Sequence, residues 1–136
     1  MKLNQIIKGF KEFERLKEDK LKGIYLLLIK VKKDTSIQIG KLRKIRFDKG
    51  NYLYVGSAQN NLRARIKRHF RKNNKTKFWH IDYLLSNKNV KIKKVFYKLA
   101  KKEEECKAAR LALKYGKPIR GFGCSDCQCR SHLIKI

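Results

Sequence analysis

Two polar residues lie on a helix face where apolar residues are expected. Residues 61–71, NLRARIKRHFR, show helical periodicity, and the face that starts at Leu62 continues through positions 65, 66, 69 and 70. Arg65 and His69 therefore lie one turn apart on the side that faces the protein. A guanidinium offers a planar fork to phosphate oxygens, and a neighbouring imidazole can hold or transfer a proton. Because a tyrosine-bearing strand precedes this helix, the pattern indicates a phosphodiester site. Alternatively, Arg65 extends past the margin of the apolar stripe and His69 is a hydrogen-bonded residue at its border.

The remaining surface of this helix is basic, and we assign its cations to nucleic-acid binding: Arg63, Lys67, Arg68 and Arg71. The whole chain has 37 Lys and Arg against 11 Asp and Glu, a formal net charge of +26. Such an excess causes strong self-repulsion unless a polyanion offsets it. A lysine-rich proteome is the alternative cause, but the size of the excess favours a nucleic-acid partner, with DNA preferred over RNA.

Short motifs follow one another in a defined order. Gly23-Ile24-Tyr25 lies on one predicted strand and Tyr54-Val55-Gly56 on another, and Asn61-Leu62 comes just before Arg65 and His69. Over residues 22–116 this order resembles the GIY-YIG nuclease superfamily. Two departures stand out. The interval between the two strand motifs is longer than usual, because of residues 32–49, and Arg65 lies one residue further from Gly56 than in many members.

The resemblance implies divalent-metal-dependent hydrolysis of a phosphodiester bond. Tyr25 and Tyr54 would lie side by side on neighbouring strands, and one of them would act as general base or orient the attacking water. A free phenol has a pKa of about 10, so Arg65, His69 and the metal would have to assist its proton transfer. Arg65 would also stabilise the charge that develops on the phosphate. The extra residue between Gly56 and Arg65 leaves Arg63 as a competitor for this role.

The resemblance also implies a metal-binding glutamate on the third helix, which corresponds to Glu105. Glu103 and Glu104 are the alternatives, and an acidic first turn also stabilises a helix dipole without any metal. Glu105 is preferred because steps of three and four residues from it reach a small-residue face that can lie against the sheet: Ala108, Ala109 and Ala112. One carboxylate, completed by water and substrate oxygens, suits a single Mg²⁺ or Mn²⁺ ion.

Two further stretches, WHIDYLL at 79–85 and GFGCSDCQCRSHL at 121–133, resemble a prokaryotic branch of the same superfamily that is often archaeal. Trp79 is expected to anchor the core, with a place beside the site as the alternative. The tail offers possible zinc ligands, although a Cys-x-Cys step suits one tetrahedral ion poorly: Cys124, Cys127, Cys129 and His132, with Cys106 as a further candidate. Buried thiols or a disulfide are the alternatives.

The elements that must position these residues follow from periodicity. An amphipathic helix is predicted over residues 2–20, as an N-terminal extension spanning 1–21. A nuclease-like domain, 22–136, then begins with a buried strand at 23–31. A hairpin, a strand at 49–58, helices near 61–71 and 79–87, a strand at 89–99 and a helix at 103–116 complete it, before a loop-like cysteine-rich tail. The order predicts an α+β fold, with a small sheet of three main strands flanked by helices.

The chain length and the distribution of apolar residues limit the possible functions. A chain of 136 residues is long enough for one domain, and its sequence shows neither a signal peptide nor a stretch of 18 apolar residues. We therefore expect a cytoplasmic protein without a membrane span. The favoured function is a metal-dependent DNA endonuclease that is structure-selective or weakly sequence-selective. The alternatives are a non-catalytic nucleic-acid-binding module and an RNA-associated structural protein.

Overall fold

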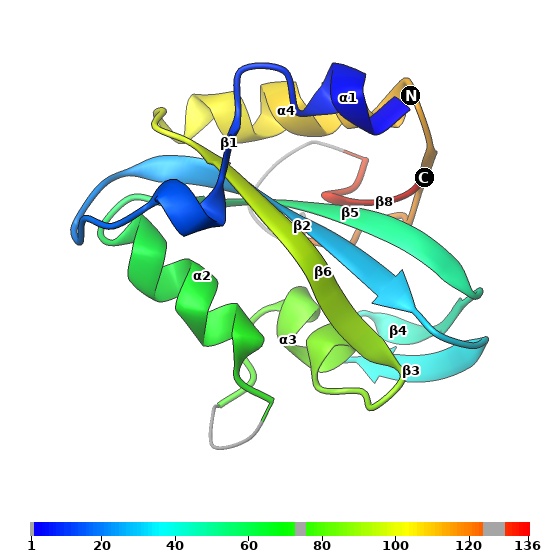
Figure 1. The fold of residues 1–136 in the computed structure, drawn as a ribbon. Coiled ribbons are helices and arrows are strands. Elements are labelled where there is room, and N and C mark those ends of the chain that lie inside the picture. Colours follow the sequence, from blue (N-terminus) through cyan, green and yellow to red (C-terminus); the bar gives the residue numbers. More distant parts are fainter. Residues whose placement is uncertain (1, 73–75, 124–129) are drawn as a thin grey trace.

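The computed structural model describes residues 2–72, 76–123 and 130–136. A six-stranded antiparallel sheet, in the order β1-β6-β2-β5-β8-β7, lies between two groups of helices (Figure 1). This confirms the predicted α+β class. No helix of these described residues is both long and apolar enough to cross a membrane.

The centre of the sheet is formed by the three predicted main strands, β2 (Gly23–Val31), β5 (Gly50–Ala58) and β6 (Val90–Lys98). β2 pairs with β5 along one edge and with β6 along the other, which places it inside the sheet. Leu26 and Leu28 pack toward α4, while Leu27 and Ile29 belong to the core cluster on the opposite face. Burial on both faces explains why the sequence of β2 is apolar almost throughout rather than alternating.

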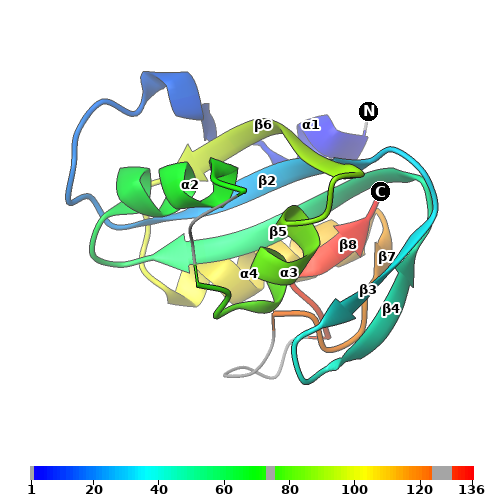
Figure 2. The same ribbon diagram turned by 90° about the horizontal axis from the view of Figure 1, so that it is seen from below.

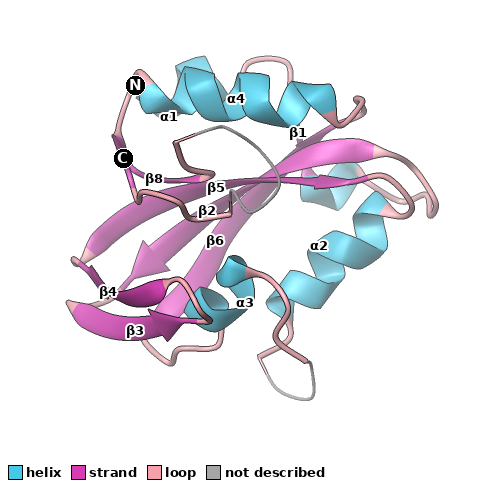
Figure 3. Ribbon diagram, turned by 180° about the vertical axis from the view of Figure 1, so that it is seen from behind, coloured by secondary structure: helices cyan, strands magenta, loops and turns pink. Residues whose placement is uncertain are grey.

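Helices cover both faces of the sheet. α1 (Lys2–Ile6) and α4 (Glu103–Leu113) lie on one face, and α2 (Leu62–Phe70) and α3 (His80–Leu85) lie on the other (Figures 1 and 3). The predicted hairpin forms a separate two-stranded sheet of β3 (Thr35–Ile39) and β4 (Arg43–Phe47) beside α3 (Figure 2). All of these elements agree with the predicted order, although α4 ends three residues before Gly116.

The prediction of one helix over residues 2–20 is wrong. α1 ends at Ile6, Gly9 has a φ of 87°, β1 (Lys11–Glu12) pairs with β6, and a 3₁₀ turn, η1, covers Phe13–Arg15. Leu3 and Ile6 pack on the α4 face of the sheet, whereas Phe13 and Leu16 pack on the α2 face. One straight helix cannot place its apolar stripe on both faces, so the segment turns at the glycine and crosses the edge of the sheet.

The tail also contributes to the sheet instead of remaining a loop. β8 (Leu133–Lys135) pairs with β5, opposite residues 52–54, and β7 (Lys117–Pro118) pairs with β8. The three main strands thus become the centre of a wider sheet. β8 stops opposite Tyr54, so the residues of β5 that follow Tyr54 extend beyond the end of β8. This leaves that end of β5 open to residues from other elements.

Candidate active site

The pairing of β2 with β5 brings the two motif tyrosines together. Tyr25 lies opposite Gly56, and Tyr54 lies opposite Leu27, so both tyrosines point to the same face as diagonal neighbours. Their ring centroids are 6.4 Å apart. A Cβ at position 56 would overlap the Tyr25 ring, which lies across the β5 backbone. Gly56 is therefore needed to let the phenol reach its place.

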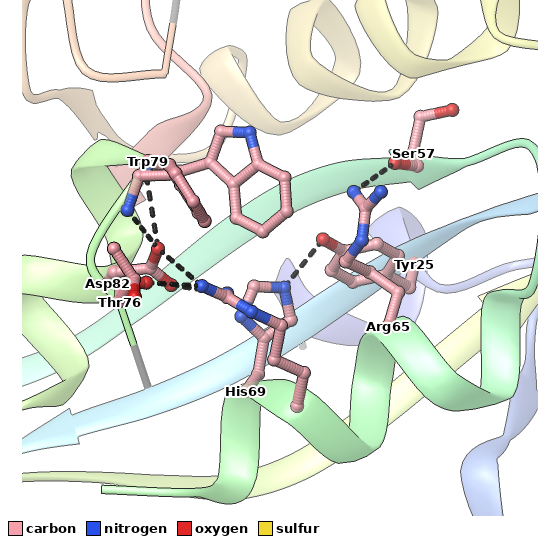
Figure 4. Close-up of polar contacts among 9 residues, drawn as sticks. Tyr25, Ser57, Arg65, His69, Thr76, Trp79 and Asp82 are labelled. Atoms are coloured by element: carbon pink, nitrogen blue, oxygen red, sulfur yellow. Dashed lines mark hydrogen bonds and ion pairs between the residues drawn. The ribbon is translucent and has the colours of Figure 1, made fainter. Parts of the chain in front are cut away.

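α2 begins close to the sheet. The Asn61 side chain accepts a hydrogen bond from the Ala64 amide at 3.0 Å and caps the helix. A Cβ at Gly23 would lie 2.8 Å from Leu62 Cδ2, which shows how closely the helix approaches β2. One face of α2 then points at the tyrosines, and His69 is 2% exposed with Nε2 2.7 Å from the Tyr25 hydroxyl (Figure 4).

Arg65 lies one turn before His69 and is half-buried. Its Nη1 donates to the Ser57 carbonyl at 3.2 Å, and its guanidinium lies 4.4 Å from the centre of the Trp79 ring (Figure 4). The predicted placement of Arg65 and His69 on the sheet-facing side is confirmed. Phe70, expected on the same face, is 49% exposed and stacks on Phe13 at 6.3 Å between ring centroids, because it ends the helix at the margin of the core.

Glu105 reaches the tyrosines from the other side of the sheet. It lies in the first turn of α4, its side chain is 14% exposed, and Oε2 is 3.7 Å from His132 Nδ1. Glu103 is exposed, and Glu104 pairs with Lys107 at 3.4 Å. Ala109 and Ala112 are fully buried, as their spacing predicts. Of the three acidic residues, Glu105 is the one whose side chain borders the same cavity as the tyrosines.

A cavity of about 310 Å³ joins these side chains. Tyr25 and Tyr54 contribute from its floor, Arg65 and Trp79 from the α2 side, and Glu105 from the α4 side. The full lining is Tyr25, Tyr54, Ser57, Gln59, Arg65, Trp79, Lys102, Glu105 and Gly123. Two cations and one carboxylate thus border a space with several neutral oxygen groups, an electrostatic setting that suits a phosphodiester.

Burial strongly affects the acidity of both tyrosines. Desolvation raises the pKa of Tyr25 well above its ordinary value, and the nearby Arg65 only partly opposes this shift. Desolvation raises the pKa of Tyr54 well above 10.0, with a further contribution from the neighbouring Tyr25. Both phenols are therefore protonated at neutral pH. Any proton transfer at Tyr25 would therefore start from its neutral hydroxyl, which is hydrogen-bonded to the imidazole of His69.

The residues assigned to nucleic-acid binding occupy different environments. Lys67 and Arg71 are exposed, and Arg63 lies 3.4 Å from Asp19. Arg68 instead forms two hydrogen bonds to Asp82, at 2.8 and 3.1 Å. That guanidinium stabilises the fold between α2 and α3, so Lys67 and Arg71 are better placed to contact a phosphate backbone.

Several lining residues differ from the favoured sequence prediction or have no signal in the sequence. Trp79 follows the alternative to the favoured core anchor: it is 38% exposed, lines the cavity and lies near the guanidiniums of Arg65 and Arg68, at 4.4 and 4.6 Å. Ser57 and Gln59 follow the tyrosine motif directly, yet no spacing rule distinguishes them from ordinary turn residues. Among the proposed zinc ligands, residues 124–129 lie outside the described part of the chain, while His132 is buried against Glu105.

The donors in the cavity fit one hard divalent ion. Glu105 supplies a carboxylate, and the phenol and amide oxygens around it are of the type that Mg²⁺ and Mn²⁺ prefer. The described residues contain no group of three or more His, Cys, Asp or Glu side chains arranged to hold a metal. A metal at Glu105 would thus depend on water and substrate oxygens for most of its ligands.

A family model for the domain of unknown function DUF123 matches residues 24–136. The chain belongs to the DUF123 family. The matched residues of this DUF123 protein include every residue that lines the cavity, and they exclude α1, β1 and η1. Neither the curated proteins nor the solved structures contain a match to it.

Proposed function

We propose that this protein is a divalent-metal-dependent endonuclease of the GIY-YIG type that hydrolyses phosphodiester bonds in DNA. One observation carries the proposal: two tyrosines, an arginine and a glutamate from β2, β5, α2 and α4 border one cavity, with a histidine bonded to one of the tyrosines. A protein that only binds nucleic acid has no need for this combination.

Arg65 would bind the phosphate to be cleaved. It lies at the cavity with Nη1 on the Ser57 carbonyl, and Trp79 restricts its guanidinium from one side. A planar guanidinium donates two parallel hydrogen bonds to a phosphate, and it stabilises the extra charge of the pentacoordinate transition state. Lys102 adds a second positive charge on the α4 side of the cavity.

Tyr25 and His69 would move the proton of the attacking water. The Tyr25 oxygen accepts the water proton while its own proton passes to Nε2 of His69, 2.7 Å away. This path avoids a free phenolate, which burial disfavours. The water oxygen bonds to phosphorus, the bond from phosphorus to the leaving oxygen breaks, and that oxygen later gains a proton from solvent. Tyr54, whose ring is 6.4 Å from that of Tyr25, would orient the water.

Glu105 would hold one Mg²⁺ or Mn²⁺ ion, which would supply positive charge to the phosphate oxygens and the leaving group. The side chain is positioned for this by α4, and the His132 contact at 3.7 Å restricts its rotation.

The test is a cleavage assay on labelled duplex, single-stranded, flapped and junction DNA and on RNA, with Mg²⁺, Mn²⁺ or EDTA. We expect metal-dependent cutting that Tyr25→Phe, Arg65→Ala and Glu105→Gln each reduce by about 10²-fold or more. Glu103→Gln is the matched control, because this exposed side chain lies in the same helical turn. Binding to the panel without cutting in any metal would contradict the proposal and favour a non-catalytic nucleic-acid-binding module.

A further inference from the structure

A second cavity, of about 580 Å³, lies between the N-terminal segment and the end of β6. Its volume is within the range of about 300 to 1,000 Å³ that is usual for ligand pockets. One wall consists of residues between Gly9 and Leu21, and the other is Tyr97, Lys98 and Leu99. The family match begins at residue 24, so the first wall is formed by a segment outside that match.

The lining combines cations with apolar surface. Lys11, Arg15, Lys17 and Lys98 border the cavity, against the single carboxylate of Glu18. Arg15 and Lys17 are exposed, and the large apolar side chain of Leu99 is 55% exposed. A positively charged surface follows the phosphates of single-stranded nucleic acid, and an exposed side chain beside it contacts the face of an unpaired base, a role that aromatic residues usually fill and that Leu99 would fill here.

This cavity lies at the same end of the sheet as the tyrosine cavity. Gly23 pairs with Ala58, and Ile24 pairs with Lys98, so β2 starts where β5 and β6 end. The β6–α4 connection borders both spaces, because Leu99 lines the second cavity and Lys102 lines the first. Three residues span at most about 11 Å.

That span is short on the scale of a nucleic acid. Successive phosphates of one strand advance by roughly 3.4 Å even when their bases are stacked. The two cavities are therefore only a few nucleotides apart, and one strand can contact both.

We propose that the second cavity, which we call the N-terminal cavity, binds an unpaired segment of the nucleic acid next to the phosphodiester held at Tyr25. The proposal rests on the proposed function for the position of cleavage. Bases within a duplex are stacked and paired, so only unpaired nucleotides can present a base face to Leu99. The preferred substrate is accordingly DNA with a single-stranded extension, such as a flap, rather than a blunt duplex.

The experiment measures binding in EDTA, where cleavage cannot interfere. Fluorescence anisotropy would compare a flapped DNA, a blunt duplex and a single-stranded oligonucleotide for three proteins. These are the wild type, Arg15→Ala/Lys17→Ala, and a control that loses the same charge at the opposite end of the sheet, Lys33→Ala/Lys88→Ala. All four side chains are exposed, so each double variant should fold.

We expect Arg15→Ala/Lys17→Ala to weaken binding of the flapped and single-stranded DNA by about tenfold. The salt dependence of binding is the slope of log K against log salt concentration. For the single strand, this variant should lower the magnitude of that slope by roughly 1.4. The control variant should bind each DNA within about twofold of the wild type. Arg15→Ala/Lys17→Ala should likewise bind the blunt duplex within about twofold of the wild type. Leu99→Ser, which keeps all charges, should weaken binding of the flapped and single-stranded DNA and leave binding of the blunt duplex unchanged.

Equal losses in the two double variants, or equal losses on flapped and blunt DNA, would overturn the proposal. Equal affinity of the wild type for flapped and blunt DNA would also overturn it. Failure of the nuclease proposal is distinguishable, because cleavage would then be absent in every metal while the preference for an extension in EDTA persists.

Discussion

Asp82 provides the sharpest test of how α2 and α3 are held together. Its side chain is fully buried and accepts four hydrogen bonds, two from Arg68 and one each from the backbone amides of Phe78 and Trp79. Replacing Asp82 by Asn removes the charge and leaves the Arg68 guanidinium, whose side chain is 17% exposed, without its counter-ion. Breaking a buried ion pair in this way costs about 3–5 kcal/mol of the free energy of unfolding.

Urea unfolding at pH 7 measures the effect of Asp82→Asn, with Asp19→Asn as the control. The Asp19 side chain is 63% exposed beside Arg63, so that change should cost no more than about 1 kcal/mol. A double-mutant cycle with Arg68→Met should give a coupling energy of about 1–3 kcal/mol. A destabilisation by Asp82→Asn no larger than that of the control would refute the reasoning.

The pH dependence follows from the same contacts. Burial by itself raises the pKa of Asp82, but hydrogen bonds from Arg68, Trp79 and Phe78 outweigh it, so the pKa in the folded state is below 3.8. A lowered folded pKa means that the stabilisation is fully present above the unfolded pKa and is lost as the pH falls through the folded value. The difference in stability between the wild type and Asp82→Asn should therefore be constant near neutral pH and shrink below about pH 4.

Three further outcomes are expected. Gly56→Ala should destabilise the fold by about 1–3 kcal/mol and displace the Tyr25 ring. Urea unfolding would measure the loss of stability, and near-ultraviolet circular dichroism would detect the displaced ring. Unchanged stability would contradict the close approach of the ring to the β5 backbone. Lys72→Met should cost about 1–3 kcal/mol in the same unfolding assay, because Nζ donates at 2.6–3.0 Å to the carbonyls of Leu85, Asn87 and Val90. In a spectrophotometric titration, Tyr52 should ionise near pH 12, since burial raises its pKa to about 12, and Tyr52→Phe should remove that late transition.

Raised tyrosine pKa values also predict how stability changes in alkali. A group whose pKa is raised by folding contributes stability below its unfolded pKa, and this is lost as the pH rises through the folded value. Because the pKa values of Tyr25, Tyr52 and Tyr54 are all raised, the folded state should weaken progressively above about pH 10.

Local patterns in the sequence determined most elements and the direction of several side chains. The apolar run of β2, the spacing of Leu62, Ile66 and His69, and the acidic start of α4 each depend on contacts within one element or between neighbours in the chain. Periods of two and of 3.6 residues fix which side chains share a face, so the inward placement of Arg65 and His69 was predictable. The placement of Tyr25 beside Tyr54 came from the family resemblance.

The tertiary structure decided what these patterns leave open. The apolar residues of the N-terminal segment fit a helical period, but they pack on two opposite faces of a sheet that a local pattern cannot represent. The choice of Glu105 over Glu103 and Glu104 depends on which of these side chains borders the tyrosine cavity, and Trp79 lies against the guanidiniums of Arg65 and Arg68 while remaining 38% exposed. Such placements are set by side chains distant in sequence, whose meeting depends on the whole arrangement of strands and helices.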